Sequence, residues 1–449
     1  MRCRVPGLCV VLGLAIVAAL AGASRVFGQG GVTVDAEGVL RLKKAADAPG
    51  GHLSQQHAAA IRTSLATKAA NPSKLRKISL KHLEQAVAQK QGALNDEIRY
   101  LAGLQRVRYV FFYPESHDIV LAGPAEGWRT DPLGRVLGIQ SGRPVVRLED
   151  LVVALRCFAP GGNQSKLVGC SIDPTQEGLA ATKRFLETYH PRSPAEVQNV
   201  VEGLRTNLGM ETISVFGVSP ETHFAQVMVE ADYRMKLIGI GLEKPPVRLA
   251  SYVDRASPAQ GRRNLQVRWF FTPDYQCVRT SGDGLAMELV GDGVKVVAED
   301  EMITAEGQRQ GSGHPDPASH QFVAAFTKVY SELAEKAPVY AELRNLIDLL
   351  VAAAYLRDQD LYAKAEWKME VLGDDKVLPV ATYQAPKQVP ATVNVAWKGK
   401  TAMTPFGGVQ IAPQSALSSE NRLPDEDGKV AKLRRQTTLN LAKGQWWWD

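Results

Sequence analysis

Lys166-Leu-Val-Gly-Cys-Ser-Ile-Asp-Pro174 opens the part of the sequence that decides the fold class. Its apolar run predicts a strand, which the Asp-Pro pair ends. A helix is expected next, and Ser193-Pro194 starts another, with serine as N-cap and proline as first helical residue. A strand is predicted over 213–218, and Ser219-Pro220-Glu221 then starts a long helix to about Ile240. Strands that alternate with helices in this way indicate an α/β domain.

Two β-rich blocks extend the pattern in both directions. The first block belongs to the same domain, predicted at 106–250, and contains the strand Tyr109-Val-Phe-Phe-Tyr113. The second block belongs to a region predicted at 264–412. Val107-Arg-Tyr-Val-Phe-Phe-Tyr-Pro-Glu115 resembles Val267-Arg-Trp-Phe-Phe-Thr-Pro-Asp274. This similarity indicates either a duplicated β unit or a chance likeness of two aromatic strands.

Helices account for much of the remaining sequence. Region 24–105 is predicted to be mainly helical, and region 264–412 contains a helical hairpin whose second helix restarts at Pro338. The polar and charged stretch 413–449 predicts a flexible basic tail. The predicted fold class is therefore α+β (mixed α/β), with two β-rich blocks, interleaved helices, a C-terminal helical hairpin and a flexible tail.

The first 23 residues have the order of a secretory signal peptide. Arg2 and Arg4 precede an uncharged apolar run from Leu8 to Ala21, and Ala21-Gly22-Ala23 offers small residues for cleavage. The run is shorter than the roughly 20 residues that span a bilayer, so an uncleaved anchor is the weaker alternative. We therefore expect a signal peptide over 1–23 and an exported protein that is periplasmic, envelope-associated or extracellular.

No transmembrane segment is expected in the mature chain. The most apolar later run, Leu343 to Leu356, contains Arg344 and Asp348 and is interpreted as a buried core helix.

The charge of the chain is mildly basic. The 449 residues include 53 Lys and Arg against 47 Asp and Glu, and removal of Arg2 and Arg4 lowers the formal net charge from +6 to +4. Basic residues gather at 68–81 and at 429–435, where a solvated face or tail is the favoured interpretation. Nucleic acid is not an expected partner, because its binding needs a concentrated basic face.

Three cysteines remain after cleavage. Cys157 and Cys170 flank a Pro-Gly-Gly turn, and they are interpreted either as a disulfide or as two buried free thiols. Cys277 would then be unpaired. No paired Cys-x-x-Cys pattern indicates zinc.

Two groups of polar residues are weak candidates for chemistry. His117-Asp118 lies at a hairpin, where a general acid/base pair is one interpretation and a polar turn the other. His314, Asp316 and His320 lie in and after a loop and are weak candidates for metal ligands. They match no standard zinc pattern. The sequence contains no Gly-x-Ser-x-Gly, no His-Glu-x-x-His and no phosphate loop, so no cofactor is predicted.

The chain ends in Trp446-Trp447-Trp448-Asp449, which is interpreted as a partner-binding element. Three adjacent exposed tryptophans would favour aggregation unless something covers them. The alternatives are a groove of the protein itself, a protein or envelope partner, and a membrane or glycan surface.

Several stretches together resemble a planctomycete family of exported proteins that carries a domain of unknown function, family 1598 of that series. They are Gly123-Pro-Ala-Glu-Gly-Trp128, Ser141-Gly-Arg-Pro-Val145, Leu148-Glu-Asp-Leu151, Gly169-Cys-Ser-Ile-Asp-Pro174, Glu230-Ala-Asp-Tyr-Arg-Met-Lys236 and Gly407-Gly-Val409. The resemblance implies export. It brings no activity, cofactor or catalytic residue.

These observations favour a binding or structural protein of the periplasm or cell envelope over an enzyme. The alternative is a secreted enzyme, most plausibly a hydrolase with a pocket at strand ends. The fold class alone does not decide between them, because one fold serves many functions.

Overall fold

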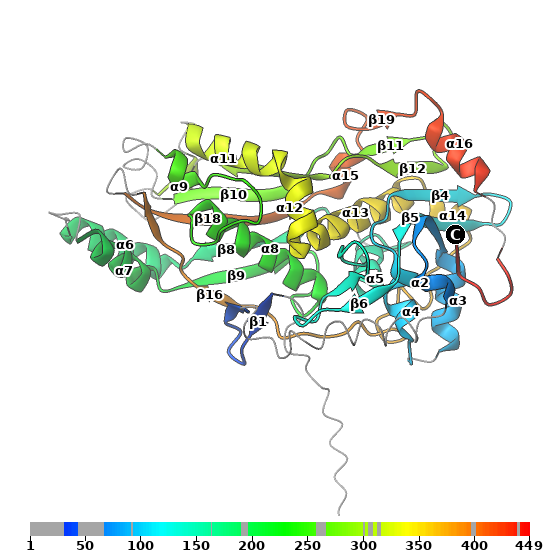
Figure 1. The fold of residues 1–449 in the computed structure, drawn as a ribbon, viewed down its shortest axis with the longest axis horizontal. Coiled ribbons are helices and arrows are strands. Elements are labelled where there is room, and N and C mark those ends of the chain that lie inside the picture. Colours follow the sequence, from blue (N-terminus) through cyan, green and yellow to red (C-terminus); the bar gives the residue numbers. More distant parts are fainter. Residues whose placement is uncertain are drawn as a thin grey trace, which may run out of the picture.

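The computed structural model describes residues 31–43, 67–90, 93–162, 164–189, 196–256, 266–299, 301–303, 309–311, 316–396, 401–437 and 441–449. In these residues the protein is a mixed α+β fold, as predicted, with two seven-stranded sheets and a group of buried helices between them (Figure 1).

The first sheet is antiparallel except where β11 meets β19. Its strands, in spatial order, are β19 (Leu423–Pro424), β11 (Val278–Thr280), β12 (Ala286–Leu289), β4 (Tyr109–Tyr113), β5 (Asp118–Ala125), β3 (Ser73–Ser79) and β20 (Trp447–Trp448).

The second sheet is antiparallel except where β10 meets β18. Its strands, in spatial order, are β13 (Val294–Glu299), β10 (Gln266–Pro273), β18 (Thr401–Ile411), β8 (Val168–Pro174), β9 (Met210–Phe216) and β16 (Gln388–Pro390), with β17 (Asn394–Ala396) paired to β18.

The two similar aromatic strands of the sequence lie in different sheets. β4 is in the first sheet, between β12 and β5, whereas β10 is in the second, between β13 and β18. The hairpin β11–β12 follows β10 in sequence and yet pairs with β4. The first sheet therefore takes strands from all four predicted regions of the mature chain.

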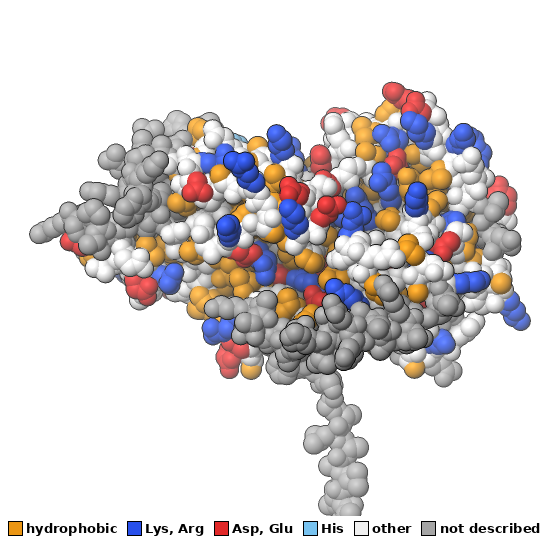
Figure 2. All heavy atoms as spheres, viewed as in Figure 1, with side chains coloured by type: hydrophobic (Ala, Val, Ile, Leu, Met, Phe, Trp, Pro, Cys, Tyr) orange, Lys and Arg blue, Asp and Glu red, His pale blue; other side chains and the backbone are white. Residues whose placement is uncertain are grey.

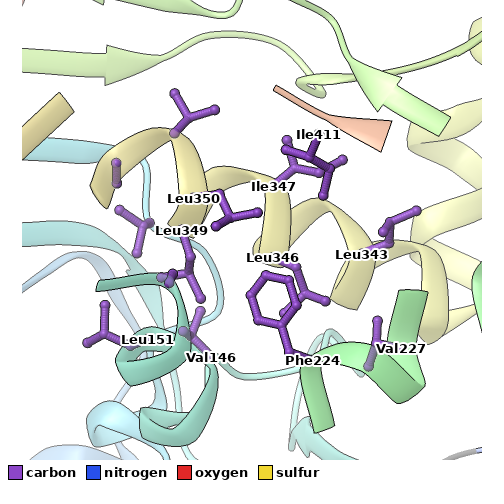
Figure 3. Close-up of a cluster of buried hydrophobic side chains, with 14 of the residues drawn as sticks. Val146, Leu151, Phe224, Val227, Leu343, Leu346, Ile347, Leu349, Leu350 and Ile411 are labelled. Carbon is purple, nitrogen blue, oxygen red and sulfur yellow. The ribbon is translucent and has the colours of Figure 1, made fainter. Parts of the chain in front are cut away.

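Helix α13 (Pro338–Asp358) forms the centre of the hydrophobic core. It packs against α5 (Leu148–Cys157) and α8 (His223–Gly239), and α8 in turn packs on β8 and β18 of the second sheet. Its side chains interlock with those of both neighbours and with β18 (Figure 3). The prediction of a buried core helix at 343–356 is thus confirmed. None of the helices described here has the length and apolar character that a membrane crossing requires.

The other described elements surround this core. The helices are α2 (Thr67–Ala70), α3 (Leu80–Gln89), α4 (Asp96–Arg99), the 3₁₀ turn η2 (Leu101–Gly103), α6 (Gln176–Thr188), α7 (Val197–Leu208), α9 (Tyr252–Arg255), α11 (Pro317–Lys328), α12 (Tyr330–Lys336), α14 (Leu361–Lys364), α15 (Pro413–Ala416) and α16 (Lys429–Gln436). Small hairpins are β1–β2 (Val32–Val34, Leu40–Leu42), β6–β7 (Trp128–Thr130, Val136–Gly138) and β14–β15 (Glu301–Ile303, Arg309–Gly311).

Two regions differ in detail from their predicted character. In the mainly helical region 24–105, the alternating sequence Ser73-Lys-Leu-Arg-Lys-Ile-Ser79 forms β3. The range 413–449, whose composition predicts a flexible tail, contains α15, β19, α16 and β20. Asp425 stabilises the start of α16 by accepting hydrogen bonds from the backbone of Val430 and Ala431.

Candidate functional site: a basic cleft

A cleft of about 650 Å³ opens where the first sheet meets α12, α13 and α16. Lys and Arg side chains gather over β4, β11 and β12 beside these helices (Figure 2). The cleft is lined by Lys74, Leu75, Gln105, Arg106, Arg108, Tyr109, Pro124, Arg143, Gly291, Asp292, Ser331, Glu335, Arg344 and Leu433.

The lining has more positive than negative charge. Five of its residues are Lys or Arg, and two, Asp292 and Glu335, are acidic. One basic group of the sequence contributes a cation to this place, since Lys74 comes from 68–81, whereas 429–435 contributes only the uncharged Leu433. Of the other cationic residues, Arg106 and Arg108 are close in sequence, while Arg143 and Arg344 are far from them and are brought to the cleft by folding.

Arg106 is the fixed cation of the cleft. Its Nε and Nη2 donate to the two oxygens of Asp348 at 2.6 and 3.3 Å, and its Nη1 donates to the carbonyl of Gly291 at 2.9 Å. Burial opposes the charge of Arg106, but Asp348 outweighs this cost and leaves the pKa of the guanidinium raised. The cation is therefore held in place by the core helix α13.

Other cations of the cleft are held loosely. Arg108 and Arg143 are 46% and 45% exposed, and they pair with Glu288 at 3.3 Å and Glu335 at 2.8 Å. The Arg143–Glu335 pair is exposed on both sides and contributes little to stability, so a ligand anion can replace this carboxylate at low cost. Glu288 is buried, but it would keep Arg279 at 2.7 Å if Arg108 turned to a ligand. Lys74 is exposed and has no acidic partner among the described residues.

Arg344 lies deeper in the cleft. Its Nη1 is 3.4 Å from Asp292 Oδ1, while its Nε is buried and has no hydrogen-bond partner among the described residues. A buried donor without a partner carries a desolvation cost that an incoming acceptor would relieve.

Apolar side chains form one wall of the cleft. Leu75, Tyr109 and Leu433 pack against the cluster that includes Phe111 on the outer face of the first sheet. The rings of Tyr109 and Phe111 are stacked with centroids 5.6 Å apart. The cleft thus combines guanidinium forks, which suit oxyanions, with a flat apolar wall that suits a ring or an aliphatic stem.

A second cavity, of about 470 Å³, lies between α5 and the segment 378–383. Two of its charged residues satisfy one another: Arg147 Nη1 is 3.1 Å from Glu149, which also accepts from the Tyr383 hydroxyl at 3.0 and 3.1 Å. With Arg99 and Arg147 as its cationic residues, this cavity offers fewer cations to a ligand than the basic cleft.

His223 and Asp150 form a buried acid–imidazole pair near this second cavity. Nδ1 of His223, at the start of α8, is 2.9 Å from Asp150 Oδ2 on α5. The ring of Tyr383 lies 6.1 Å from that of His223. No Ser or Cys contact to this imidazole is found in the described part of the chain, so the pair serves to join α5 to α8.

His117 and Asp118 lie side by side in the β4–β5 turn and point to different places. His117 adopts φ 50°, and its Nδ1 lies 3.0 Å from the carbonyl of Lys364. Asp118 is buried, with Oδ2 3.3 Å from Nδ1 of His82, and burial raises its pKa above the usual value. The proximity of His82 to Asp118 was not predicted from the sequence.

Ser79, His82 and Asp118 are the residue types of a nucleophile, a base and an orienting acid, but their geometry is different. Ser79 Oγ is 2.8 Å from Nδ1 of His82, the same nitrogen that faces Asp118. A proton relay needs the two partners on opposite ring nitrogens. Ser79 instead caps α3 by accepting from the backbone N–H of His82.

The predicted metal candidates are not gathered around one point in the described structure. Asp316 is the N-cap of α11, accepts from the backbone of Ala318 and Ser319, and receives the hydroxyl of Tyr252 at 2.7 Å. His320 is exposed on α11, and His314 lies outside the described residues. The described residues contain no group of three or more His, Cys, Asp or Glu that could hold a metal ion.

The cysteines in the described part of the chain are buried thiols. Cys157 and Cys170 are both free in the structure, as is Cys277. Burial raises the pKa of Cys157 to about 11 and that of Cys170 well above its ordinary value. Thiols held in the protonated form are weak nucleophiles.

Trp446, Trp447 and Trp448 pack against the protein itself and are only 6%, 7% and 9% exposed. Trp447 and Trp448 form β20, at the edge of the first sheet.

Helix α8 carries charged residues on two faces, and one face reaches a network centred on Arg135. Nη2 of Arg135 lies 2.6 Å from both carboxylate oxygens of Glu230, and its Nη1 contacts Glu342 of α13. Arg234, one turn after Glu230, bonds the same carboxylate at 3.0 Å and Glu243 at 2.6 Å. The network joins the β6–β7 hairpin to the two central helices.

The other face of α8 carries Lys236, which is fully buried against the second sheet. Its Nζ donates to Asp232 at 2.7 Å, to the Gly407 carbonyl at 3.1 Å and to the Ile172 carbonyl at 3.4 Å. Gly407 has φ +115°, and a Cβ there would lie 1.9 Å from the Trp269 carbonyl oxygen. This position therefore requires glycine.

A model of the family described as "Protein of unknown function (DUF1598)" matches residues 170–252. The resemblance noted in the sequence is therefore confirmed for this part of the chain, which runs from β8 to α9 and contains Glu230, Asp232, Arg234 and Lys236. No curated protein matches the chain. No solved structure matches it either.

Proposed function

We propose that this protein is an exported binding protein whose basic cleft takes a compact polyanion that carries sulfate or phosphate esters. The observation that carries the proposal is the excess of five cationic residues over two acidic ones in one cleft with an apolar wall. Planar guanidinium groups bind tetrahedral oxyanions through paired hydrogen bonds, and the aromatic and aliphatic wall supports the carbon frame of the ligand.

The way in which the cations of the cleft are held supports ligand binding as well as a structural use. Arg106 is fixed by Asp348, and Lys74 is exposed with no acidic partner among the described residues. Arg108 and Arg143 are about half exposed and pair with Glu288 and Glu335, which a ligand anion would replace. The hydrolase alternative receives no comparable support, because the described residues show no nucleophile hydrogen-bonded to an oriented base in this cleft.

Neutralising two exposed cations is expected to weaken binding. The variant Lys74→Gln/Arg108→Gln should bind a heparin-derived tetrasaccharide and inositol hexakisphosphate about 10- to 100-fold more weakly than the wild type, since each of the two lost contacts contributes roughly 0.7–1.4 kcal/mol. Isothermal titration calorimetry at 50 and 200 mM NaCl measures this, and the affinity of the wild type should fall with salt.

The matched control is Lys295→Gln/Lys376→Gln, which removes the same charge from exposed positions outside the cleft lining. It should retain wild-type affinity. Equal losses in both double variants, or no binding of either probe by the wild type, would contradict the proposal. Preference for one probe identifies sulfate or phosphate as the natural group.

Export is proposed from the order of charges, apolar run and small residues over 1–23. Amino-terminal sequencing of the protein recovered from envelope and extracellular fractions should begin after Ala23. A cytosolic protein that still begins at Met1 would contradict this part of the proposal.

A further inference from the structure

The outer edge of β3 holds a short strand from the far end of the sequence. β20 pairs antiparallel with it, with Trp447 opposite Ile78 and Trp448 opposite Lys77. The backbone N–H of Ser79 donates to the Trp446 carbonyl at 3.0 Å. On its other edge β3 pairs with β5, so β20 covers the edge that the sheet itself leaves open.

A buried arginine recognises the acidic residue that ends this segment. Arg76 is 0% exposed, and its Nε and Nη2 donate to the two carboxylate oxygens of Asp449 at 2.9 and 3.0 Å. Its Nη1 donates to the carbonyls of Ala69 and Ala102, which fix the guanidinium from behind. The carbonyls of Ala69 and Ala102 thus hold the Arg76 guanidinium in place, and its two remaining donor nitrogens bind the carboxylate of Asp449.

Trp447 and Trp448 contact different parts of the protein. The guanidinium of Arg76 lies 4.5 Å from the centre of the Trp447 ring, and the indole N–H of Trp447 donates to Glu97 at 2.5 Å. Trp448 packs into the cluster around Phe111 on the outer face of the sheet, with the amine of Lys77 at 5.8 Å. We refer to Arg76, Lys77, Ile78, Glu97 and Phe111 as the β3 groove.

The connection between α16 and β20 runs from 437 to 445, and its described part is held weakly. Ala442, Lys443 and Gly444 are exposed, and no atom lies within 4 Å of the place where a Cβ on Gly444 would be. The backbone bond from Gln445 to the Ala442 carbonyl is local. Apart from partial packing of Leu441, recognition therefore resides in residues 446–449.

We propose that the β3 groove also accepts residues 446–449 of a second copy of this chain, so that two copies exchange β20 and form a dimer. The contacts of the groove are the same whichever copy supplies the segment, so exchange costs only the association of the two chains. The covalent connection gives the protein's own segment an effective concentration of roughly millimolar, which keeps the wild type monomeric at micromolar concentrations.

The length of the connection provides the test. Thr437 lies at the end of α16, whose Arg434 carbonyl accepts from the Tyr113 hydroxyl on β4. β20 is three strand positions from β4, which is about 14 Å at the usual strand spacing. Deletion of 438–444 leaves only Gln445 between Thr437 and Trp446, a reach of about 8 Å. The shortened chain therefore cannot fill its own groove.

The shortened chain is expected to be more than nine-tenths dimeric at about 50 μM by size-exclusion chromatography with light scattering, while the wild type is monomeric. The same deletion with Asp449→Lys should be monomeric, because its segment cannot bind Arg76. Adding about 1 mM of the peptide Gln-Trp-Trp-Trp-Asp should convert the shortened dimer into monomer.

A shortened chain that retains wild-type circular dichroism but stays monomeric overturns the proposal. A dimer that persists with Asp449→Lys, or in excess peptide, overturns it as well, because contact would then lie elsewhere. Neither result bears on polyanion binding by the basic cleft, which is measured with the wild-type chain.

Discussion

Arg135→Leu is expected to lower the free energy of unfolding by about 3–5 kcal/mol, because it leaves buried carboxylates without their cation. Glu230 is 2% exposed and Glu342 is 6% exposed, measured on their side chains. Arg234 would remain beside Glu230, but no second cation among the described residues pairs with Glu342. Urea denaturation at pH 7, followed by circular dichroism, measures the loss.

Arg129→Leu is the matched control, since Arg129 is on the same small hairpin and is only half-buried. It should cost less than about 1 kcal/mol. Adding Glu342→Gln to Arg135→Leu should restore part of the stability, because it removes one of the stranded charges. A loss below 1 kcal/mol for Arg135→Leu would show that water or rearrangement satisfies the two acids, and would refute the proposed role.

The stability of the protein is expected to fall as pH rises from about 4.5 to 8, and Glu211 is the main cause. Glu211 is 1% exposed, and its Oε1 has no hydrogen-bond partner among the described residues. Burial raises its pKa to about 8, despite the opposing charge of Lys236. Asp232 contributes at lower pH, since burial raises its pKa to about 6.

Proton linkage explains why stability falls, rather than rises, with pH in this range. Between its unfolded pKa of about 4.5 and its folded pKa, Glu211 keeps a proton in the folded state that the unfolded state has released. Each pH unit in this window therefore costs about 1.4 kcal/mol of stability. From pH 6.5 to 8, above the folded pKa of Asp232, the wild type should lose roughly 1–2 kcal/mol.

Glu211→Gln replaces the protonated acid with a neutral side chain of similar shape, and it should remove most of this slope. Urea denaturation at pH 6.5, 7.2 and 8.0 gives the comparison. Glu187→Gln, at an exposed position, should retain the wild-type slope. Parallel slopes for the wild type and Glu211→Gln would mean that Glu211 is ionised in the folded protein across this range.

Local elements were predictable because their signals lie within a few residues. For example, the serine before Leu80 caps α3, and Leu80, Leu83 and Val87 are buried on one face at helical spacing. Pro338 does restart a helix. The aromatic strands were also predicted, since apolar β-forming residues specify them locally, and an Asp-Gly turn does the same for the β11–β12 hairpin.

The arrangement of the strands could not be predicted in the same way. Nothing in the periodicity of 278–289 distinguishes pairing with β10, its neighbour in sequence, from pairing with β4. β3 was missed because its Lys and Arg residues hide a strand of which Arg76, Ile78 and Ser79 are the buried residues. Arg76 itself is a buried cation, which sequence patterns place on the surface.

The basic cleft could not be predicted from the sequence either, because residues far apart in the chain form it. The local basic group at 68–81 gave a partial signal, since Lys74 belongs to it, whereas the group at 429–435 supplies only the uncharged Leu433. Arg143 and Arg344, however, are far in sequence from the other cationic residues of the cleft, and an isolated arginine indicates only a solvated surface.

The first sheet also determines when this protein can finish folding. Its edge joins Arg76 to Asp449, which are 373 positions apart, and its interior joins β4 to a hairpin made much later. A chain that emerges from a ribosome or a membrane channel with its amino terminus first must wait for Asp449 before this sheet is complete. Contacts at such long separation slow folding, so the nascent chain spends a long period with the edge of β3 uncovered. The edge of β3 therefore stays uncovered until residues 446–449 have been synthesised. During this period chaperones and proteases can bind the incomplete sheet.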